Sequence, residues 1–355
     1  MYTFFNPNAP FPTWQQFLKR SDNIGLNVMQ AKQKYLTEQT NYYRMMQPAP
    51  LMESAVAGAG SVSTDTTPSL LLDSSVVRTD LVGAYSLRKL RTAYTGSAIQ
   101  VQSGSSGATL DVGFDANGYL DTESINIFNV NNDMLLLEKW YDQSGNVNDA
   151  DGNSTSRRLQ ITDSNGNFFT GSNGQIRFRI NEAHKGSQFV SGLTSIFPAS
   201  GSFTVFGVHF NNMFPSVYQN QEILYAADAS GNGLLQLRSN LGSGLIENRQ
   251  SQLAGMPAVN VMTSGTVQTK HNTFNQITFI GNQNPGTTSL IHNGVVCETT
   301  TTFTIPAIHV FYFPDPQVGT IGDDPTEFLL YNADKTSLRD TIESNQNDFY
   351  LMNQE

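Results

Sequence analysis

Short apolar runs separated by turn residues make up most of the chain from about residue 69 onward. The clearest run is Ser202–Phe210, in which five of the nine residues are Phe or Val. Further runs of this kind lie at residues 223–225, 233–237, 276–280, 289–292, 308–313 and 328–331. Short runs bounded by turn signals, such as the hairpin dipeptide Asn293-Gly294, are typical of antiparallel strands. The pattern predicts an all-β fold, a two-sheet sandwich over residues 69–335.

A helical period replaces this pattern near the C-terminus. Leu338, Ile342, Asn345 and Phe349 are spaced three or four residues apart, as on one face of a helix. The spacing predicts a helix over residues 337–351 that closes the sandwich.

The N-terminal region has a different composition. Residues 1–12 contain three prolines and are expected to be extended, and Thr13 is a candidate helix cap. Partly heptad-like spacing then favours a helical attachment arm over residues 1–47, with a helix that packs on its own domain or an unordered terminus as alternatives. Residues 48–68, rich in Pro, Gly, Ala and Thr, predict a linker before the globular body, residues 69–355. The candidate anchoring and oligomer-forming residues of the arm are Trp14, Phe17, Val28, Tyr35 and Tyr42.

Charge and the rare residue types narrow the classes of function. The formal net charge of −10 disfavours binding to nucleic acid or to an anionic membrane, because like charges repel. No apolar run approaches the ~18 residues that a membrane-spanning helix needs. The single cysteine, Cys297, excludes an intrachain disulfide, and the first residues lack a signal-peptide pattern, so we expect synthesis in a reducing cytoplasm. The five histidines lack the spacing of a zinc site.

One motif, Trp140–Asn146, stands at the end of an ordered series of motifs. The earlier members of the series are Gly83–Leu90, Tyr94–Val101, Asp111–Phe114 and Leu120–Thr122. In order and spacing, the series resembles the start of the catalytic domain of arabinofuranosidase B-type enzymes. It resembles equally the concanavalin A-like, or laminin G-like, modules of phage and virus structural proteins. The resemblance covers about Leu81–Asn153, and more weakly Glu327–Tyr331 and Arg339–Tyr350. It implies a concanavalin A-like antiparallel β-sandwich of the jelly-roll type.

The resemblance to the arabinofuranosidases also implies a place for catalytic carboxylates. Those enzymes are retaining hydrolases, which hold a nucleophile and an acid/base about 5 Å apart. The loop Gly319–Asp324 resembles the acid/base motif, with Asp324, or Asp323, at the acidic position. On the strand that resembles the nucleophile strand, Ser239 stands where a glutamate is expected, and the adjacent cysteines of the family's sugar pocket are missing. Glu222 and Glu247 lie nearby as replacement candidates. Because of these departures we expect the chain not to be an enzyme.

Clusters of Asp and Asn raise the question of a metal ion. Asp142, Asp149, Asp151 and Asn153 share one polar stretch, and oxygen ligands on loops suit Ca²⁺, which laminin G-like modules often bind. The spacing does not match a helix–loop–helix calcium loop, so solvated turns are the favoured interpretation. We expect no cofactor, with Ca²⁺ at Asp142, Asp149 and Asp151 as the alternative.

Three functions follow from these observations. The favoured one is a virion structural protein: a capsid decoration, head fibre or tail-associated subunit, made in the host cytoplasm. In it, residues 1–47 would bind capsid or tail proteins, and the chain would form a homo-oligomer such as a trimer. The alternative is a carbohydrate-binding module whose exposed aromatic side chains bind cell-surface glycans. An arabinofuranosidase-like glycoside hydrolase is the third.

Overall fold

A computed structural model describes most of the globular body. The described residues are 70–152, 159–171, 174–179, 189–191, 201–211, 221–227, 233–240, 245–250, 260–268, 273–282, 287–300, 310–312 and 324–350. The contacts divide the chain into two compact units, Met1–Thr66 and Thr67–Glu355, and all described residues belong to the second. The predicted arm and linker, with Trp14, Phe17, Val28, Tyr35 and Tyr42, lie outside the described residues.

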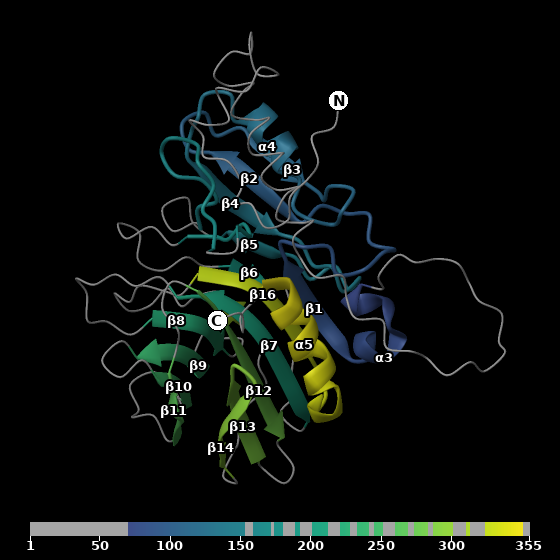
Figure 1. Ribbon diagram of the computed structural model, residues 1–355, viewed down its shortest axis with the longest axis vertical. Helices are drawn as coiled ribbons and strands as arrows, with labels where there is room; N and C mark the ends of the chain where they lie inside the picture. The colour runs from purple at the N-terminus through teal and green to yellow at the C-terminus, as the bar shows by residue number, and fades with distance from the viewer. Residues whose placement is uncertain are drawn as a thin grey trace, which may run out of the picture. The chain divides into compact units, whose positions relative to one another are not determined.

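A six-stranded antiparallel sheet forms one layer of this body (Figure 1). Its strands, in spatial order, are β1 (Leu81–Ser86), β16 (Asp324–Tyr331), β7 (Ser202–Phe210), β12 (Phe274–Asn282), β13 (Thr287–His292) and β14 (Val295–Thr300). The first strand of the body thus pairs with its last strand, 241 residues apart at the Ser86–Glu327 contact.

A ten-stranded sheet forms the other layer, and its paired strands are also antiparallel. In spatial order its strands are β11 (Asn260–Gln268), β10 (Leu245–Gln250), β9 (Gly233–Asn240), β8 (Gln221–Ala227), β15 (Val310–Tyr312), β6 (Phe189–Ser191), β5 (Ala150–Gly152), β4 (Leu135–Trp140), β2 (Ile99–Ser103) and β3 (Thr109–Val112).

The helical elements are short, except for the last one. They are η2 (Leu71–Asp73), α3 (Ser75–Arg78), α4 (Thr122–Phe128), η3 (Thr336–Leu338) and α5 (Arg339–Tyr350). The side chain of Asp121 accepts the backbone N–H of Ser124 and so caps α4. Helix α5 confirms the C-terminal helix expected from the spacing of Leu338, Ile342 and Phe349. No helix in the described part of the chain is long and apolar enough to cross a membrane.

The main hydrophobic core lies between the two sheets. Side chains alternate between the two faces of a strand, so every second position of a strand faces the other sheet. The six-stranded sheet contributes side chains such as Phe203, Phe279 and Leu330, and the ten-stranded sheet contributes side chains such as Val101 and Trp140. The body is therefore a mostly antiparallel β-sandwich, as the sequence predicts at this level of detail.

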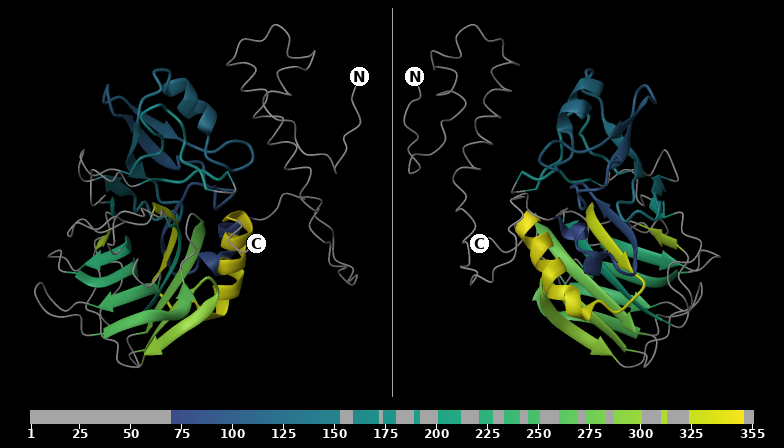
Figure 2. Two further views of the ribbon diagram at one scale, coloured as in Figure 1. Left: turned by 60° about the vertical axis from the view of Figure 1, so that its left-hand side comes forward. Right: turned by 90° about the vertical axis from the view of Figure 1, so that its right-hand side faces the viewer.

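A second apolar cluster covers the opposite face of the six-stranded sheet. Phe206 of β7 and Leu329 and Tyr331 of β16 pack there against Ile342 of α5 and Leu72 of η2. Figure 2 shows α5 running along this face of the sheet. The six-stranded sheet is therefore covered on both faces, by the other sheet and by α5.

Candidate functional site

Three charged residues occupy one row across neighbouring strands of the ten-stranded sheet. Glu222 of β8 pairs with Arg238 of β9, and Arg238 pairs in turn with Glu247 of β10. Neighbouring strands lie about 4.8 Å apart, so the two glutamate Cα atoms are separated by roughly 10 Å. We call Glu222, Arg238 and Glu247 the charged row.

The register assigns the charged row to the face of the sheet that points away from the core. Leu224 is buried in the core and pairs with Leu237, so position 237 belongs to the core face. Successive positions of a strand alternate between faces, so position 238 belongs to the other face. Glu222 and Glu247 pair directly with Arg238 and share its face.

Ser239 does not belong to the charged row. It pairs with Gln221 on one side and with Ile246 on the other, one position beyond Arg238. That single step assigns Ser239 to the core face of the sheet. The family resemblance set Ser239 in the nucleophile position. A shift of one residue in the strand register, however, exchanges the face of the sheet to which each position belongs. The bulge between Glu222 and Leu224, which shifts the register by one, was not visible in the sequence.

Asp324 lies in the other sheet, where it is the first residue of β16. It is buried, pairs with Phe210 of β7, and forms an ion pair with the Arg177 guanidinium. Arg177 also donates to the backbone oxygen of Thr170 at 3.1 Å and lies 4.1 Å from the centre of the Phe210 ring. Burial lowers the pKa of Arg177, and the nearby Asp324 carboxylate opposes that effect.

The Arg177–Asp324 ion pair bears on the role expected for Asp324. A guanidinium beside a carboxyl group favours its ionised form, which does not suit a proton donor. Asp324 belongs to the six-stranded sheet, whereas the charged row belongs to the ten-stranded sheet. Asp323 and the rest of the loop Gly319–Asp323 lie outside the described residues.

The Trp140–Asn146 motif fastens a turn to β1. Trp140 is buried, and its ring lies 5.7 Å from that of Tyr85. The carboxylate of Asp142 accepts the backbone N–H groups of Ala84 and Ser144, each at 2.8 Å. The Asn146 side chain donates to the backbone oxygen of Leu81 at 2.7 Å. These contacts hold the turn after β4 against β1.

The acidic residues considered for Ca²⁺ have partners within the chain. Burial raises the pKa of Asp142, although its hydrogen bonds to Ser144, Ala84 and Asn148 oppose that effect. Asp149 accepts the backbone N–H of Asp142 at 3.0 Å, and Asp151 forms an ion pair with Lys139 at 3.2 Å. Within the described ranges, no group of three or more His, Cys, Asp or Glu is placed to hold a metal ion. Asn153 lies outside those ranges.

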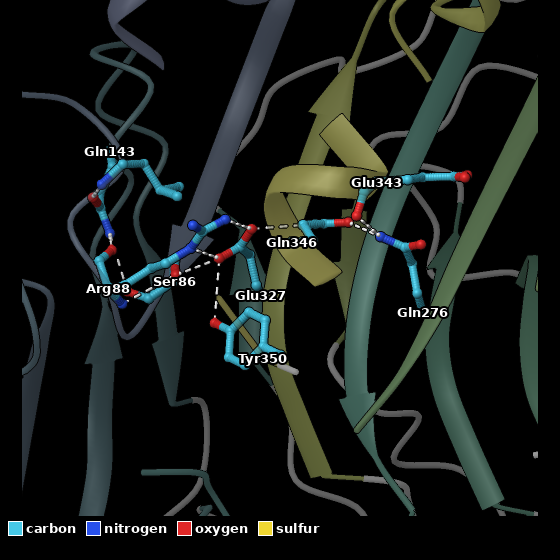
Figure 3. Close-up of polar contacts among 9 residues, drawn as sticks. Ser86, Arg88, Gln143, Gln276, Glu327, Glu343, Gln346 and Tyr350 are labelled. Carbon is cyan, nitrogen blue, oxygen red and sulfur yellow. Dashed lines mark hydrogen bonds and ion pairs between the residues drawn. The ribbon is translucent and has the colours of Figure 1, made fainter. Parts of the chain in front are cut away.

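A buried ion pair that the sequence did not reveal joins Arg88, two residues after β1, to Glu327 of β16, and side chains of α5 contact it (Figure 3). Arg88 donates to the Glu327 carboxylate twice, from Nε to Oε2 at 2.8 Å and from Nη2 to Oε1 at 3.0 Å. Ser86, Gln346 and Tyr350 donate to the same carboxylate at 2.8, 3.2 and 3.2 Å. One signal in the sequence was Glu327, a charged residue directly before the apolar run 328–331.

The surroundings of Glu327 keep its carboxyl group ionised. Burial by itself would raise the pKa of Glu327, but the Arg88 guanidinium and the other donors hold it below its usual value. The carboxylate is enclosed by these donors and by α5, so we assign this cluster to structure rather than to ligand binding.

No protein-family model and no curated protein matches the chain. Its fold is nevertheless similar to that of solved arabinofuranosidases. A GH54 α-L-arabinofuranosidase soaked with a cyclic sulfate inhibitor matches with a TM-score of 0.54 and 12% identity over 75% of this chain. An arabinofuranosidase complexed with arabinofuranosyl-α-1,2-xylobiose matches with the same values. A GH54 variant soaked with 4-nitrophenyl α-L-arabinofuranoside matches with a TM-score of 0.53, 12% identity and the same 75% coverage.

These likenesses are likenesses of fold, because the identity is low. The match spans 62% of the length of each of the three arabinofuranosidase chains. They support the arabinofuranosidase side of the resemblance seen in the motifs and give no link to phage or viral proteins.

Two interpretations made from the sequence are corrected by this finding. The interpretation as a virion structural protein is wrong, because the matching folds are those of glycoside hydrolases. The expected capsid or tail partners and the virion location rested on that interpretation. The expectation that the chain is not an enzyme is contradicted by the same likeness. It relied on the departures from the family's motifs at Ser239 and Asp324.

Proposed function

We propose that this chain is a carbohydrate-active protein, a glycoside hydrolase that acts on arabinofuranosyl-containing glycans and has a sandwich of the concanavalin A-like, jelly-roll type. The observation that carries the proposal is the charged row, in which the register of β8, β9 and β10 sets two glutamate positions on either side of an arginine position. The fold likeness to arabinofuranosidases supports the choice of substrate class.

The charged row contains the residue types that glycoside hydrolysis needs. One carboxyl group protonates the leaving oxygen, and a second carboxylate acts as nucleophile or activates a water molecule. The transition state resembles an oxocarbenium ion, so a nearby carboxylate stabilises its positive charge. In this proposal Glu222 and Glu247 supply the two carboxyl groups.

Turnover of a chromogenic arabinofuranoside by the full chain tests the proposal. We expect Glu222→Gln and Glu247→Gln each to lower kcat by about 10²-fold or more, the usual effect of losing an acid–base group. Ser239→Ala is the matched control on the neighbouring row and should keep the wild-type rate. The anomeric configuration of the first product, followed by NMR, then distinguishes a retaining from an inverting mechanism.

Two results would contradict this assignment. Loss of turnover in Asp324→Asn together with full activity in both glutamate variants would move the chemistry to the six-stranded sheet. Binding of arabinose-containing oligosaccharides with no turnover of any of them would leave a carbohydrate-binding module.

A further inference from the structure

A polar cavity lies between α5 and the turn that joins β13 to β14. Its volume is 210 Å³, and every residue that lines it is polar except Gly294. The residues that matter for the argument are Gln276, Asn293, Arg339, Glu343, Ser344 and Asn347. The cavity lies on the α5 side of the six-stranded sheet, so it is separate from the charged row of the ten-stranded sheet.

Hydrogen bonds fix the walls of this cavity (Figure 3). Thr278 donates to Oε1 of Glu343 at 2.7 Å, which sets the position of that carboxyl group. The Gln276 side chain donates to the backbone oxygen of Glu343 at 3.1 Å and to Oε1 of Gln346 at 2.8 Å. The side-chain oxygen of Asn293 accepts the backbone N–H of Gln276 at 2.8 Å. A site whose groups are already held in place loses little entropy when a ligand binds.

Two oxygen atoms at the cavity have unused capacity to accept hydrogen bonds. Oε2 of Glu343 forms an ion pair with Nε of Arg339 at 3.7 Å, a separation too long for a hydrogen bond. Oδ1 of Asn347 is buried and has no hydrogen-bond partner within the described part of the chain. A buried acceptor without a donor costs free energy, so Oδ1 of Asn347 favours a ligand that carries donors, and Oε2 of Glu343 can accept a further hydrogen bond beside it.

The charges around the cavity favour a neutral ligand. Glu343 is only 6% exposed, and burial raises its pKa, although the Thr278 hydroxyl and Arg339 oppose that effect. The remaining charges are those of Arg339 and Asp340, which form an ion pair at 3.1 Å. An anion would meet the two acidic side chains, and a cation would compete with Arg339. A neutral molecule with several hydroxyl groups both donates and accepts, and it suits all of these residues.

We propose that this cavity is a second carbohydrate site, which binds one sugar unit through Glu343, Asn347 and Arg339. The choice of a sugar among neutral hydroxylated ligands rests on the proposed function, whereas the cavity and its unused acceptors do not. The site would hold a glycan on the opposite side of the sandwich from the charged row.

Binding of L-arabinose and of xylobiose to the full chain, measured by saturation-transfer NMR and calorimetry, tests this proposal. The starting protein carries both Glu222→Gln and Glu247→Gln, so that the two proposed catalytic carboxylates play no part in the binding that is measured. We expect it to bind a sugar. We expect Asn347→Leu, added to it, to weaken binding at least about tenfold, the effect of losing one or two hydrogen bonds. Ser344→Trp, at an exposed position of α5 that lines the cavity, should block binding without disturbing the core.

The outcomes separate this proposal from the proposed hydrolase activity. Sugar binding by the double glutamate variant that Ser344→Trp abolishes supports the second site, whether or not the wild-type chain hydrolyses a substrate. Unchanged affinity in both Asn347→Leu and Ser344→Trp, or no sugar binding by the double glutamate variant, would overturn it. Absence of turnover by the wild-type chain would count against the proposed hydrolase activity and not against the second site.

Discussion

Arg88 and Glu327 show how much a single buried ion pair contributes to this fold. Arg88→Met leaves the Glu327 carboxylate buried without its cation, and such changes cost about 3–5 kcal/mol of unfolding free energy. Urea denaturation followed by circular dichroism measures the loss. The control is Asp151→Asn, which breaks the ion pair with Lys139. The side chains of Asp151 and Lys139 are 63% and 31% exposed, so we expect a loss of about 0–1 kcal/mol of unfolding free energy. Equal losses in the two variants would show that the buried pair is not special.

The same carboxylate should make stability depend on pH. The folded-state pKa of Glu327 lies below the ordinary value of 4.5, so its contribution is fully present above that value. The contribution is lost as the pH falls through the lower folded-state pKa, because protonation removes the ion pair. We therefore expect urea midpoints to fall as the pH drops below 4.5. The fall should be shallower in Glu327→Gln, and parallel pH profiles of the two proteins would contradict this assignment.

At the residue scale, the sequence identified individual acidic side chains but not their partners. Glu222, Glu247 and Asp324 were candidates from the sequence, yet nothing local indicated Arg238 or Arg177 as their neighbours. Arg177 and Asp324 lie 147 positions apart, so only the packed chain brings them together.

Gly207 determines how closely β7 packs against its neighbouring strands. A Cβ atom there would lie 2.6 Å from a ring carbon of Phe328 and 3.1 Å from a methyl carbon of Ile277. Gly207→Ala should therefore destabilise the protein by about 1–3 kcal/mol through overpacking. Gly113→Ala is the matched control, because nothing lies within 4 Å of its Cβ, and its effect should stay within about 0.5 kcal/mol. Thermal unfolding of the two variants makes the comparison, and similar midpoints would contradict the packing argument.

At the element scale, strands with dense apolar runs were predictable and polar strands were not. Strand β7 fills the run Ser202–Phe210 that the sequence marked most clearly. Strand β11, Asn260–Gln268, contains Thr, Ser, Asn and Gln among few apolar residues, so the pattern gave no signal for it. Such a strand forms because its backbone groups pair with β10, and this pairing is not a local property.

The globular body should fold without the N-terminal unit. The unit Thr67–Glu355 contains the described hydrophobic clusters, and a unit with its own core folds alone. A chain that starts at Thr67 should therefore keep a β-rich far-ultraviolet spectrum and a single cooperative unfolding transition. A spectrum without fixed aromatic signals in the near ultraviolet would show that the body needs residues 1–66.

At the scale of the whole molecule, the sequence by itself determined the fold class and the C-terminal helix. The alternation of strands and the helical period of Leu338, Ile342 and Phe349 are local patterns, and each can be found within one segment. The tertiary structure alone decided which face each strand presents, because that depends on the register with a distant partner and on the bulge after Glu222. This register sets Glu222 and Glu247 in one row with Arg238 and leaves Ser239 one position outside it.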